Sequence, residues 1–242
     1  MIDNKKRKIF KSISYRMLGT LSISTISYMV TGDIKSSGLI GVIHMFTNMI
    51  IYVLHDFLWE RISWGKSKGM FIQMTGLSGS GKSTIANKAK IELEKQGYKV
   101  EVIDGDYYRE HLCKDLGFSK KDRNENIKRL GFVGNVLAKN GIISIMSAIN
   151  PYEEIRAELR KFGEHIKTVY IKADISVLSQ RDPKGLYKRA TLPDDDPNKL
   201  KNFTGISDVF DSPLVCDLTI ETDKSSEEES VKKLVKYIVD NT

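Results

Sequence analysis

Short runs of apolar, β-prone residues alternate with longer helical patterns from residue 70 to the C-terminus. The apolar runs predict buried strands near residues 71–75, 99–103, 142–147, 167–172 and 217–221. The helical patterns between and after them lie near residues 83–96, 106–115, 122–139, 153–163 and 226–240. Strands that alternate with helices form parallel sheets. The sequence therefore predicts an α/β fold, with a parallel sheet that carries helices on both faces.

The N-terminal part of the chain has a different pattern, in which a short polar break separates two uncharged apolar runs. The runs cover residues 17–31 and 38–53. Two apolar runs around a tight turn predict a helical hairpin, because a cleaved signal peptide has only one such run. Each run is slightly shorter than the ~30 Å hydrocarbon core of a bilayer requires. We expect a transmembrane hairpin over residues 1–65 and a second domain over residues 69–242; the alternative is a soluble or interfacial amphipathic hairpin.

Charge is distributed unevenly between these two parts. The formal net charge of the whole chain is +7, but residues 1–68 carry ten basic and four acidic residues, and the remainder carries 28 and 27. The second domain is therefore nearly neutral, and the basic pI gives no reason to expect a nucleic-acid partner. Both outer flanks of the hairpin are basic, so the positive-inside rule predicts an inner-membrane protein with both termini and the second domain on the cytoplasmic side.

The N-terminal segment also resembles a family of small uncharacterised bacterial membrane proteins. The matching residues are Lys11-Ser12-Ile13-Ser14-Tyr15-Arg16, Thr31-Gly32, Tyr52-Val53-Leu54-His55-Asp56 and Trp59-Glu60-Arg61-Ile62. This resemblance implies a membrane location and no chemistry.

A glycine-rich loop follows the first predicted strand of the second domain directly. It fits the pattern G-x-x-x-x-G-K-[ST] between a strand and a helix. Glycines let backbone N–H groups converge on phosphate oxygens, and the helix N-terminus adds partial positive charge. Lys82 would reach the β- and γ-phosphates of ATP, and the Ser83 hydroxyl would ligate Mg²⁺. The expected nucleotide-binding residues are Gly76, Leu77, Ser78, Gly79, Ser80, Gly81, Lys82, Ser83 and Thr84.

Two carboxylates, Asp104 and Asp106, follow the second predicted strand. Ligands of open parallel sheets bind beyond the carboxyl ends of the strands, so these groups are placed for Mg²⁺ or for a substrate hydroxyl. Further along, Arg123 and Asn126 share a helix face with Arg129 or Leu130. Such a face is suited to clamp an anion.

The second domain resembles the adenylylsulfate kinase family along residues 70–242. The resemblance rests on the glycine-rich loop, Asp104-Gly105-Asp106 with Arg109, Gly117-Phe118-Ser119, Asp122-Arg123-x-Glu125-Asn126-Ile127, Asn150-Pro151-Tyr152 with Arg156, Arg181-Asp182-Pro183-Lys184-Gly185-Leu186-Tyr187-Lys188, and Phe203-Thr204-Gly205-Ile206. The last two runs are far more specific than the loop. Members of this family transfer the γ-phosphoryl of ATP to the ribose 3′-hydroxyl of adenosine 5′-phosphosulfate, and dimerisation to a homodimer is usual among them.

The resemblance implies a role for each matched residue. Asp106 would orient the 3′-hydroxyl and accept its proton, with Lys82 and Asp104 as the other catalytic residues. Phe118 and Phe203 would sandwich the adenine, a stacking interaction that contributes about 1–3 kcal/mol per base. Lys184 opens a polar stretch, residues 182–211, that would close as a lid, and Arg181 would contact the base of ATP. The implied acceptor-binding residues are Asp106, Arg109, Phe118, Arg123, Asn126, Lys184 and Phe203.

Two positions depart from the family pattern. Asn150 replaces a serine that is common before the Pro-Tyr pair and that has been described as a phosphoserine intermediate. An amide cannot carry a phosphoryl group, so we expect direct in-line transfer. Glu153 stands where a basic residue is common. A 3′-kinase for another 5′-modified nucleotide, such as a cytidine diphosphate derivative, and a catalytically inactive nucleotide-sensing membrane module are the alternatives.

Overall fold

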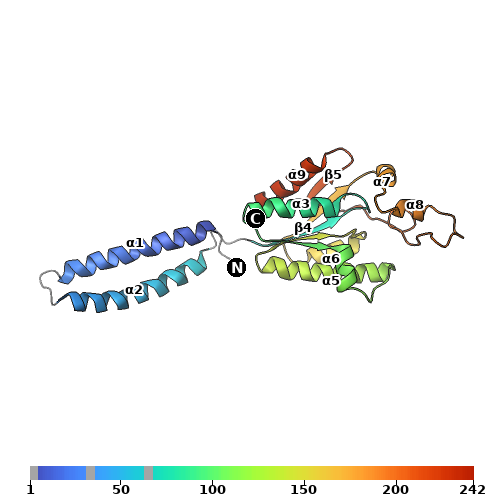
Figure 1. The fold of residues 1–242 in the computed structure, drawn as a ribbon. Helices are drawn as coiled ribbons and strands as arrows, with labels where there is room; N and C mark the ends of the chain where they lie inside the picture. The colour runs from blue at the N-terminus through green and yellow to red at the C-terminus, as the bar shows by residue number, and fades with distance from the viewer. Residues whose placement is uncertain (1–4, 31–35, 63–67) are drawn as a thin grey trace. The chain divides into compact units, whose positions relative to one another are not determined.

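The computed structural model describes residues 5–30, 36–62 and 68–242 of the chain (Figure 1). The chain divides into two compact units, Met1–Ser67 and Lys68–Thr242. The first contains the two helices of the predicted hairpin, and the second contains the predicted sheet.

The N-terminal unit is a pair of helices, α1 (Lys5–Val30) and α2 (Ser36–Arg61), which pack against each other in antiparallel directions (Figure 1). Many of their exposed side chains are large and apolar. Among them are Phe10, Met17, Met29, Phe46, Met49, Ile50, Val53 and Leu58, all more than half exposed.

Polar side chains lie between the two helices. Lys11 forms an ion pair with Asp56. The Ser14 Oγ lies 2.7 Å from the Nε2 of His55, which also accepts a hydrogen bond of 3.0 Å from the indole N–H of Trp59. His55 is only 5% exposed. The described part of the hairpin is therefore polar along the contact between its helices and apolar on much of its outside.

The helical hairpin is present as predicted. Within residues 5–30, 36–62 and 68–242, no helix combines the length and the apolar character needed to cross a membrane.

The C-terminal unit is built on a five-stranded, all-parallel sheet with the strand order β2-β3-β1-β4-β5. In register, Ile72 of the central strand β1 is opposite Ile145 of β3 and Lys167 of β4. All five predicted strands are present, with ends within one residue of the predicted ones. They are β1 (Met70–Thr75), β2 (Val100–Asp104), β3 (Ile143–Ser147), β4 (Ile166–Lys172) and β5 (Leu218–Glu221).

Helices cover both faces of this sheet, as the sequence predicts. Figure 1 shows α3 and α9 on one face and α5 and α6 on the other. Their bounds are Lys82–Lys95 for α3, Lys120–Lys139 for α5, Glu153–Arg160 for α6 and Glu227–Asp240 for α9. The short helix α4 (Gly105–His111) follows β2. Two further short helices, α7 (Ile175–Arg181) and α8 (Leu186–Ala190), were not predicted.

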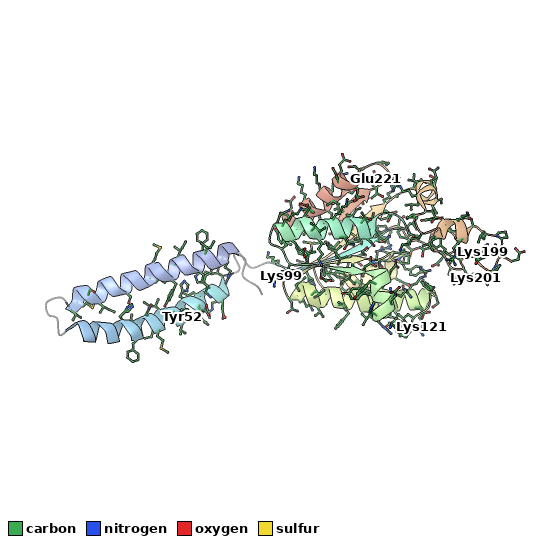
Figure 2. All side chains as sticks on the ribbon, viewed as in Figure 1. Tyr52, Lys99, Lys121, Lys199, Lys201 and Glu221 are labelled. Carbon is green, nitrogen blue, oxygen red and sulfur yellow. The ribbon has the colours of Figure 1, made fainter. Side chains whose placement is uncertain are left out.

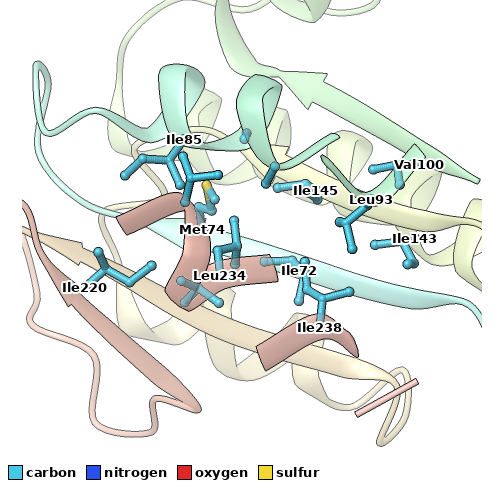
Figure 3. Close-up of a cluster of buried hydrophobic side chains, with 14 of the residues drawn as sticks. Ile72, Met74, Ile85, Leu93, Val100, Ile143, Ile145, Ile220, Leu234 and Ile238 are labelled. Atoms are coloured by element: carbon cyan, nitrogen blue, oxygen red, sulfur yellow. The ribbon is translucent and has the colours of Figure 1, made fainter. Parts of the chain in front are cut away.

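The side chains of β1 alternate between the two halves of the core. Ile72 and Met74 pack toward α3 and α9, where Leu93 is also fully buried (Figure 3). Phe71 points to the other face and packs beneath α5. A Cβ at Gly134 would lie 2.5 Å from the Phe71 ring, so glycine allows α5 to approach the sheet this closely. Each large apolar side chain buried in this way contributes roughly 1.5–3 kcal/mol.

The topology brings three functional segments to one edge of the sheet. The neighbouring strands β1 and β3 send their connections in opposite directions, since the chain runs from β1 through α3 to β2 and from β3 through α6 to β4. A crevice therefore forms at the carboxyl ends of these strands. The glycine-rich loop follows β1, the carboxylate pair follows β2, and the turn at residues 148–152 follows β3.

Candidate active site

A cavity of about 600 Å³ opens at the carboxyl ends of β1, β2 and β3. Its wall includes the loop after β1, the start of α4, the start of α5 and the turn after β3. The remaining wall comes from residues of two stretches, 182–187 and 200–204. Figure 2 shows Lys199 and Lys201 in the region beyond α8, in the stretch that was predicted to form a lid. The cavity therefore joins the predicted phosphate-binding and acceptor-binding segments.

The glycine-rich loop adopts a backbone that only glycine takes up readily. Gly79 and Gly81 have φ angles of 75° and 93°, in the left-handed region. At Gly76 a Cβ would lie 2.3 Å from the carbonyl oxygen of Ile171 on β4. These glycines let the loop curl over the N-terminus of α3, where backbone N–H groups without helical partners favour an anion.

Lys82 is buried against this loop, with 8% exposure. Its ammonium group donates to the carbonyl oxygens of Gly76 and Leu77, at 2.9 and 2.7 Å, and to the Ser80 Oγ at 3.3 Å. Burial lowers the pKa of Lys82 to about 7. A phosphate group at the loop would favour the charged form, so ligand binding and protonation of Lys82 are coupled.

Oxygen ligands gather beside the loop. The Ser83 hydroxyl donates to the Asp104 carboxylate at 2.7 Å and lies 2.9 Å from the Ser147 Oγ. The second oxygen of Asp104 accepts from the backbone N–H groups of Asp106 and Tyr107 and caps α4. Hydroxyl and carboxylate oxygens suit Mg²⁺, which usually takes few protein ligands in phosphate sites. The residues present therefore fit the expected magnesium.

Asp106 contacts the stretch of residues 182–211 that was predicted to form a lid. The Lys184 ammonium group lies 2.6 Å from the Asp106 Oδ2, and this hydrogen bond raises the pKa of Lys184. The two side chains are 61% and 79% exposed, so the ion pair is accessible to solvent. Residues that are 78 positions apart in the chain thus meet above the loop.

Both arginines predicted for the acceptor line the cavity and flank Phe118. The Arg109 guanidinium lies 4.7 Å from the centre of the Phe118 ring, and that of Arg123 lies 5.7 Å from it. Arg123 also donates to the Phe118 carbonyl at 3.0 Å, to the Thr204 hydroxyl at 3.0 Å and to the Asn202 carbonyl at 2.5 Å. Arg123 therefore connects α5 to the lid stretch, in addition to lining the site.

The other predicted residues of the acceptor side are also in the lining. Asn126 is 5% exposed, and its side-chain oxygen has no hydrogen-bond partner among the described residues. Phe118 is 61% exposed, whereas Phe203 is 8% exposed and packs edge-on against Tyr187, with ring centres 5.0 Å apart. An exposed ring and a buried ring thus line the same cavity.

Some residues named from the sequence lie outside this cavity lining: Gly76, Leu77 and Ser80 of the loop, and the arginines Arg129 and Arg181. Arg129 forms ion pairs with Asp115 at 2.8 Å and Glu125 at 3.0 Å. Arg181 donates to the carbonyl of Thr222 at 2.9 Å. Neither guanidinium lines the cavity.

Sequence reasoning missed Ser147, and it assigned no contact to Tyr187 and Asn150 although both lie in motifs that it named. Ser147 ends β3 and meets Ser83, and its only signal is a polar residue at the carboxyl end of an apolar strand. Tyr187 donates its hydroxyl to the Ser78 carbonyl at 3.0 Å and so ties α8 to the loop. Burial raises the pKa of Tyr187 to about 12, so it remains a donor at neutral pH. Asn150 lines the cavity from a buried, left-handed position, with φ 45°.

Comparison with known families divides the chain in the same way as the pattern of its residues. Residues 68–221 match a family described as adenylylsulphate kinase. Residues 9–60 match a family described as predicted membrane protein (DUF2061).

Individual relatives and solved structures are similar to the C-terminal unit. An adenylyl-sulfate kinase from Microcystis aeruginosa is 47% identical over 170 residues, which cover 70% of this chain and 91% of the relative. One from Halothermothrix orenii is 45% identical over 172 residues, 71% and 90% of the two chains. An APS kinase from Mycobacterium tuberculosis, solved in complex with AMPPNP and APS, is 35% identical with a TM-score of 0.65, over 71% of this chain and 98% of that one. A hexameric APS kinase from Thiobacillus denitrificans is 26% identical with a TM-score of 0.55, over 77% and 32%.

Together, the match over residues 68–221, the identity of 47% to a curated relative and the ordered motifs around one cavity place this chain in the adenylylsulfate kinase family.

Proposed function

We propose that this chain is an adenylylsulfate kinase, which transfers the γ-phosphoryl of ATP to the 3′-hydroxyl of adenosine 5′-phosphosulfate and releases ADP and 3′-phosphoadenylylsulfate. The observation that carries the proposal is the cavity itself, where the glycine-rich loop with Lys82 and the carboxylate of Asp106 line one space. The names of the relatives, and the APS kinase solved with AMPPNP and APS, support it.

The loop side of the cavity would hold the triphosphate of ATP. Backbone N–H groups of residues 76–84 and the N-terminus of α3 would bind phosphate oxygens, and Lys82 would turn from the loop carbonyls to the β- and γ-phosphates. Ser83 and Asp104 would hold Mg²⁺, directly or through water. The bound ion would neutralise charge on the β- and γ-phosphate oxygens.

The opposite side of the cavity would hold the acceptor nucleotide. Asp106 would orient the 3′-hydroxyl in line with the γ-phosphorus and accept its proton. Arg109, Arg123, Asn126 and Lys184 would bind the anionic phosphosulfate and the ribose. The adenine would stack on the exposed ring of Phe118, with Phe203 on its other side, and Arg181 would approach the base of ATP only after a change in its position.

Transfer would be direct, without a phosphorylated enzyme. The side chain at the turn after β3 is the amide of Asn150, which cannot accept a phosphoryl group. Phosphoryl transfer requires mainly positioning and charge neutralisation, and the groups around the cavity supply both.

A competition between acceptors tests the proposed function. The purified full chain is given Mg·ATP with adenosine 5′-phosphosulfate, with a cytidine diphosphate derivative, or with both, and ADP release is measured by a coupled assay. We expect ADP formation with adenosine 5′-phosphosulfate at a kcat/KM at least about a hundredfold above that for the cytidine nucleotide. A preference for the cytidine nucleotide would identify the other acceptor class. No ADP with either nucleotide, despite binding of Mg·ATP, would reject the kinase assignment.

We also propose that residues 1–65 attach the kinase domain, residues 69–242, to the cytoplasmic face of a membrane. The support is the distribution of side chains in the hairpin, where Lys11 pairs with Asp56 between the helices and large apolar side chains face outward. A surface of this kind is stable only against an apolar surrounding. The match to a family described as predicted membrane protein supports the same location, and the basic flanks favour a cytoplasmic orientation of both ends.

Vesicle flotation tests this attachment. The full chain is expected to float with vesicles of phosphatidylcholine and phosphatidylglycerol, and the double variant Met49→Asp/Ile50→Asp is expected to bind at least about tenfold less, because an acidic residue inside an apolar layer costs about 2.5–3.5 kcal/mol. Met49 and Ile50 are 68% and 61% exposed on α2. The matched control, Ile91→Asp/Phe132→Asp, changes exposed apolar residues of the kinase domain and should float like the wild type. Equal flotation of all three proteins would reject the hairpin as the attachment site.

A further inference from the structure

Arg156 is the largest fully buried side chain of the kinase domain, and it lies directly behind the acceptor side of the cavity. Its guanidinium donates to the Asn150 carbonyl at 2.7 Å, to the Thr75 hydroxyl at 3.2 Å and to the Asp211 carbonyl at 2.7 Å. A buried cation is stable only when its donors are satisfied and its charge is paired. Here Glu153, one helical turn earlier on α6, supplies the charge at 2.9–3.0 Å.

The Glu153 carboxylate has hydrogen-bond partners in addition to Arg156. One carboxylate oxygen accepts from Arg160, and the other accepts from Arg156 and, at 3.3 Å, from the backbone N–H of Leu214. The backbone N–H of Glu153 donates to the Asp211 carboxylate at 3.0 Å. The start of α6 is therefore joined to residues 211–214 through both the side chain and the backbone of Glu153.

The turn at residues 150–152 depends on this junction. Asn150 has a left-handed backbone, φ 45°, which asparagine adopts more readily than other non-glycine residues. Its carbonyl is held by Arg156, and the Pro151 carbonyl accepts from the backbone N–H of Asp211 at 2.9 Å. The Tyr152 hydroxyl donates to the Asp208 carboxylate at 2.7 Å.

The same contacts continue to the acceptor-binding residues. Asp208 lies 3.7 Å from Arg123, which in turn donates to Thr204 and to the carbonyl of Phe118. A shift of the 150–152 turn would therefore displace Asp208 and the guanidinium of Arg123. The start of the glycine-rich loop touches the same network, because the Gly76 N–H donates to the Ile149 carbonyl at 3.1 Å and the Thr75 hydroxyl to the Asn150 carbonyl at 2.9 Å. The rest of the loop has supports of its own, because Ser78 is held by Tyr187 and the Ser80 carbonyl by the Thr222 hydroxyl.

We propose that Glu153 is a positioning residue for the acceptor nucleotide. By pairing with Arg156 and Arg160 it fixes the turn at residues 150–152 and, through Asp208, the guanidinium of Arg123 on the acceptor side. A basic residue at position 153 would place a third cation beside Arg156 and Arg160. In this chain Glu153 instead supplies the counterion of the buried Arg156. The inference rests on the proposed kinase function and adds to it a residue that touches neither substrate.

The variant Glu153→Gln keeps the shape of the side chain and removes its charge. We expect the KM for adenosine 5′-phosphosulfate to rise about tenfold or more, while the KM for ATP stays within about twofold, because Ser78 and Ser80 of the loop are held by Tyr187 and Thr222, outside the junction. Glu153→Asp keeps the charge and should recover at least part of this loss. The matched control is Glu154→Gln, since Glu154 is the next residue of α6 and pairs at the surface with Lys120 at 3.3 Å.

Four quantities measured on the full chain decide the matter: the KM for ATP, the KM for the acceptor, kcat and the thermal unfolding midpoint. A lower midpoint with unchanged KM values, or an equal rise of both KM values, would mean that Glu153 only stabilises the fold and would overturn the inference. A Glu153→Gln protein that does not fold leaves the comparison to Glu153→Asp, whose shorter side chain should still raise the acceptor KM alone. Wild-type protein that forms no ADP with any acceptor would instead overturn the proposed function, and with it this inference.

Discussion

Replacing Lys82 by methionine should lower kcat/KM for phosphoryl transfer by about a thousandfold, the upper range for removing one preorganised charge from a site of phosphate chemistry. Methionine keeps most of the volume of the lysine side chain and removes only the ammonium group. In the structure this group donates to the carbonyl oxygens of Gly76 and Leu77. ATP offers it phosphate oxygens instead, and their interaction should be strongest when charge moves onto the leaving ADP. Initial rates over a range of ATP and acceptor concentrations measure the effect.

The protonation of Lys82 gives a second test of its contact with the phosphates of ATP. Burial lowers the pKa of Lys82 to about 7, so at pH 8 most of the free protein carries a neutral amine. The phosphates of ATP raise this pKa, so binding at pH 8 should take up close to one proton, and ATP affinity should fall as the pH rises from 7 to 9. Calorimetry in two buffers of different ionisation enthalpy detects the proton.

The matched control for both measurements is Lys90→Met, which removes a lysine from the same helix, where it pairs with Glu101 at the surface at 3.2 Å. We expect this variant to keep the activity and the proton uptake of the wild type, because exposed ion pairs contribute little. Lys82→Met with activity within tenfold of the wild type, or with the same proton uptake, would contradict the assigned role.

The strands and the glycine-rich loop could be predicted from the sequence, because their signals lie in short stretches of the chain. The apolar run Met70–Thr75 is buried at every position, and the loop that follows it has the glycines that its backbone needs. The short helices α7 and α8 gave no comparable signal, because their seven and five residues lie in a polar stretch with little periodicity. α8 is fixed by a contact distant in sequence, between Tyr187 and the Ser78 carbonyl.

The sequence named individual candidate residues for the site, but it did not predict the contacts between them. Sequence motifs indicated Arg123 as an anion ligand, whereas in the structure three of its hydrogen bonds go to Phe118, Asn202 and Thr204. The same limitation applies to Lys184, whose pairing with Asp106 joins residues 78 positions apart. Long-range pairs of this kind depend on the parallel sheet, because the chain after β2 and the chain after β4 both leave it at the carboxyl ends of the strands, and no local spacing encodes them.

The change Asp106→Asn should lower kcat by at least a hundredfold, because it removes the group that accepts the proton of the attacking hydroxyl and leaves the shape of the side chain intact. The KM for ATP should stay within about threefold, since the glycine-rich loop is untouched. The control is Glu110→Gln, a change of an acidic residue on the same helix, α4, that does not line the cavity. Single-turnover rates measured beside steady-state rates separate a slow chemical step from slow product release.

The ion pair with Lys184 allows a second explanation of such a loss, because the amide would also leave the lysine without its counterion. A double-mutant cycle separates the two. If Asp106 accepts the proton, Asp106→Asn should cost about as much in a Lys184→Gln background as in the wild type, that is, still about a hundredfold. If its only role is to hold the lid lysine, the double variant should be no slower than Lys184→Gln alone, and the assignment of Asp106 as the proton acceptor would have to be withdrawn. Equal losses in both backgrounds would place the chemistry on the carboxylate, because the lysine would then have no part in the effect.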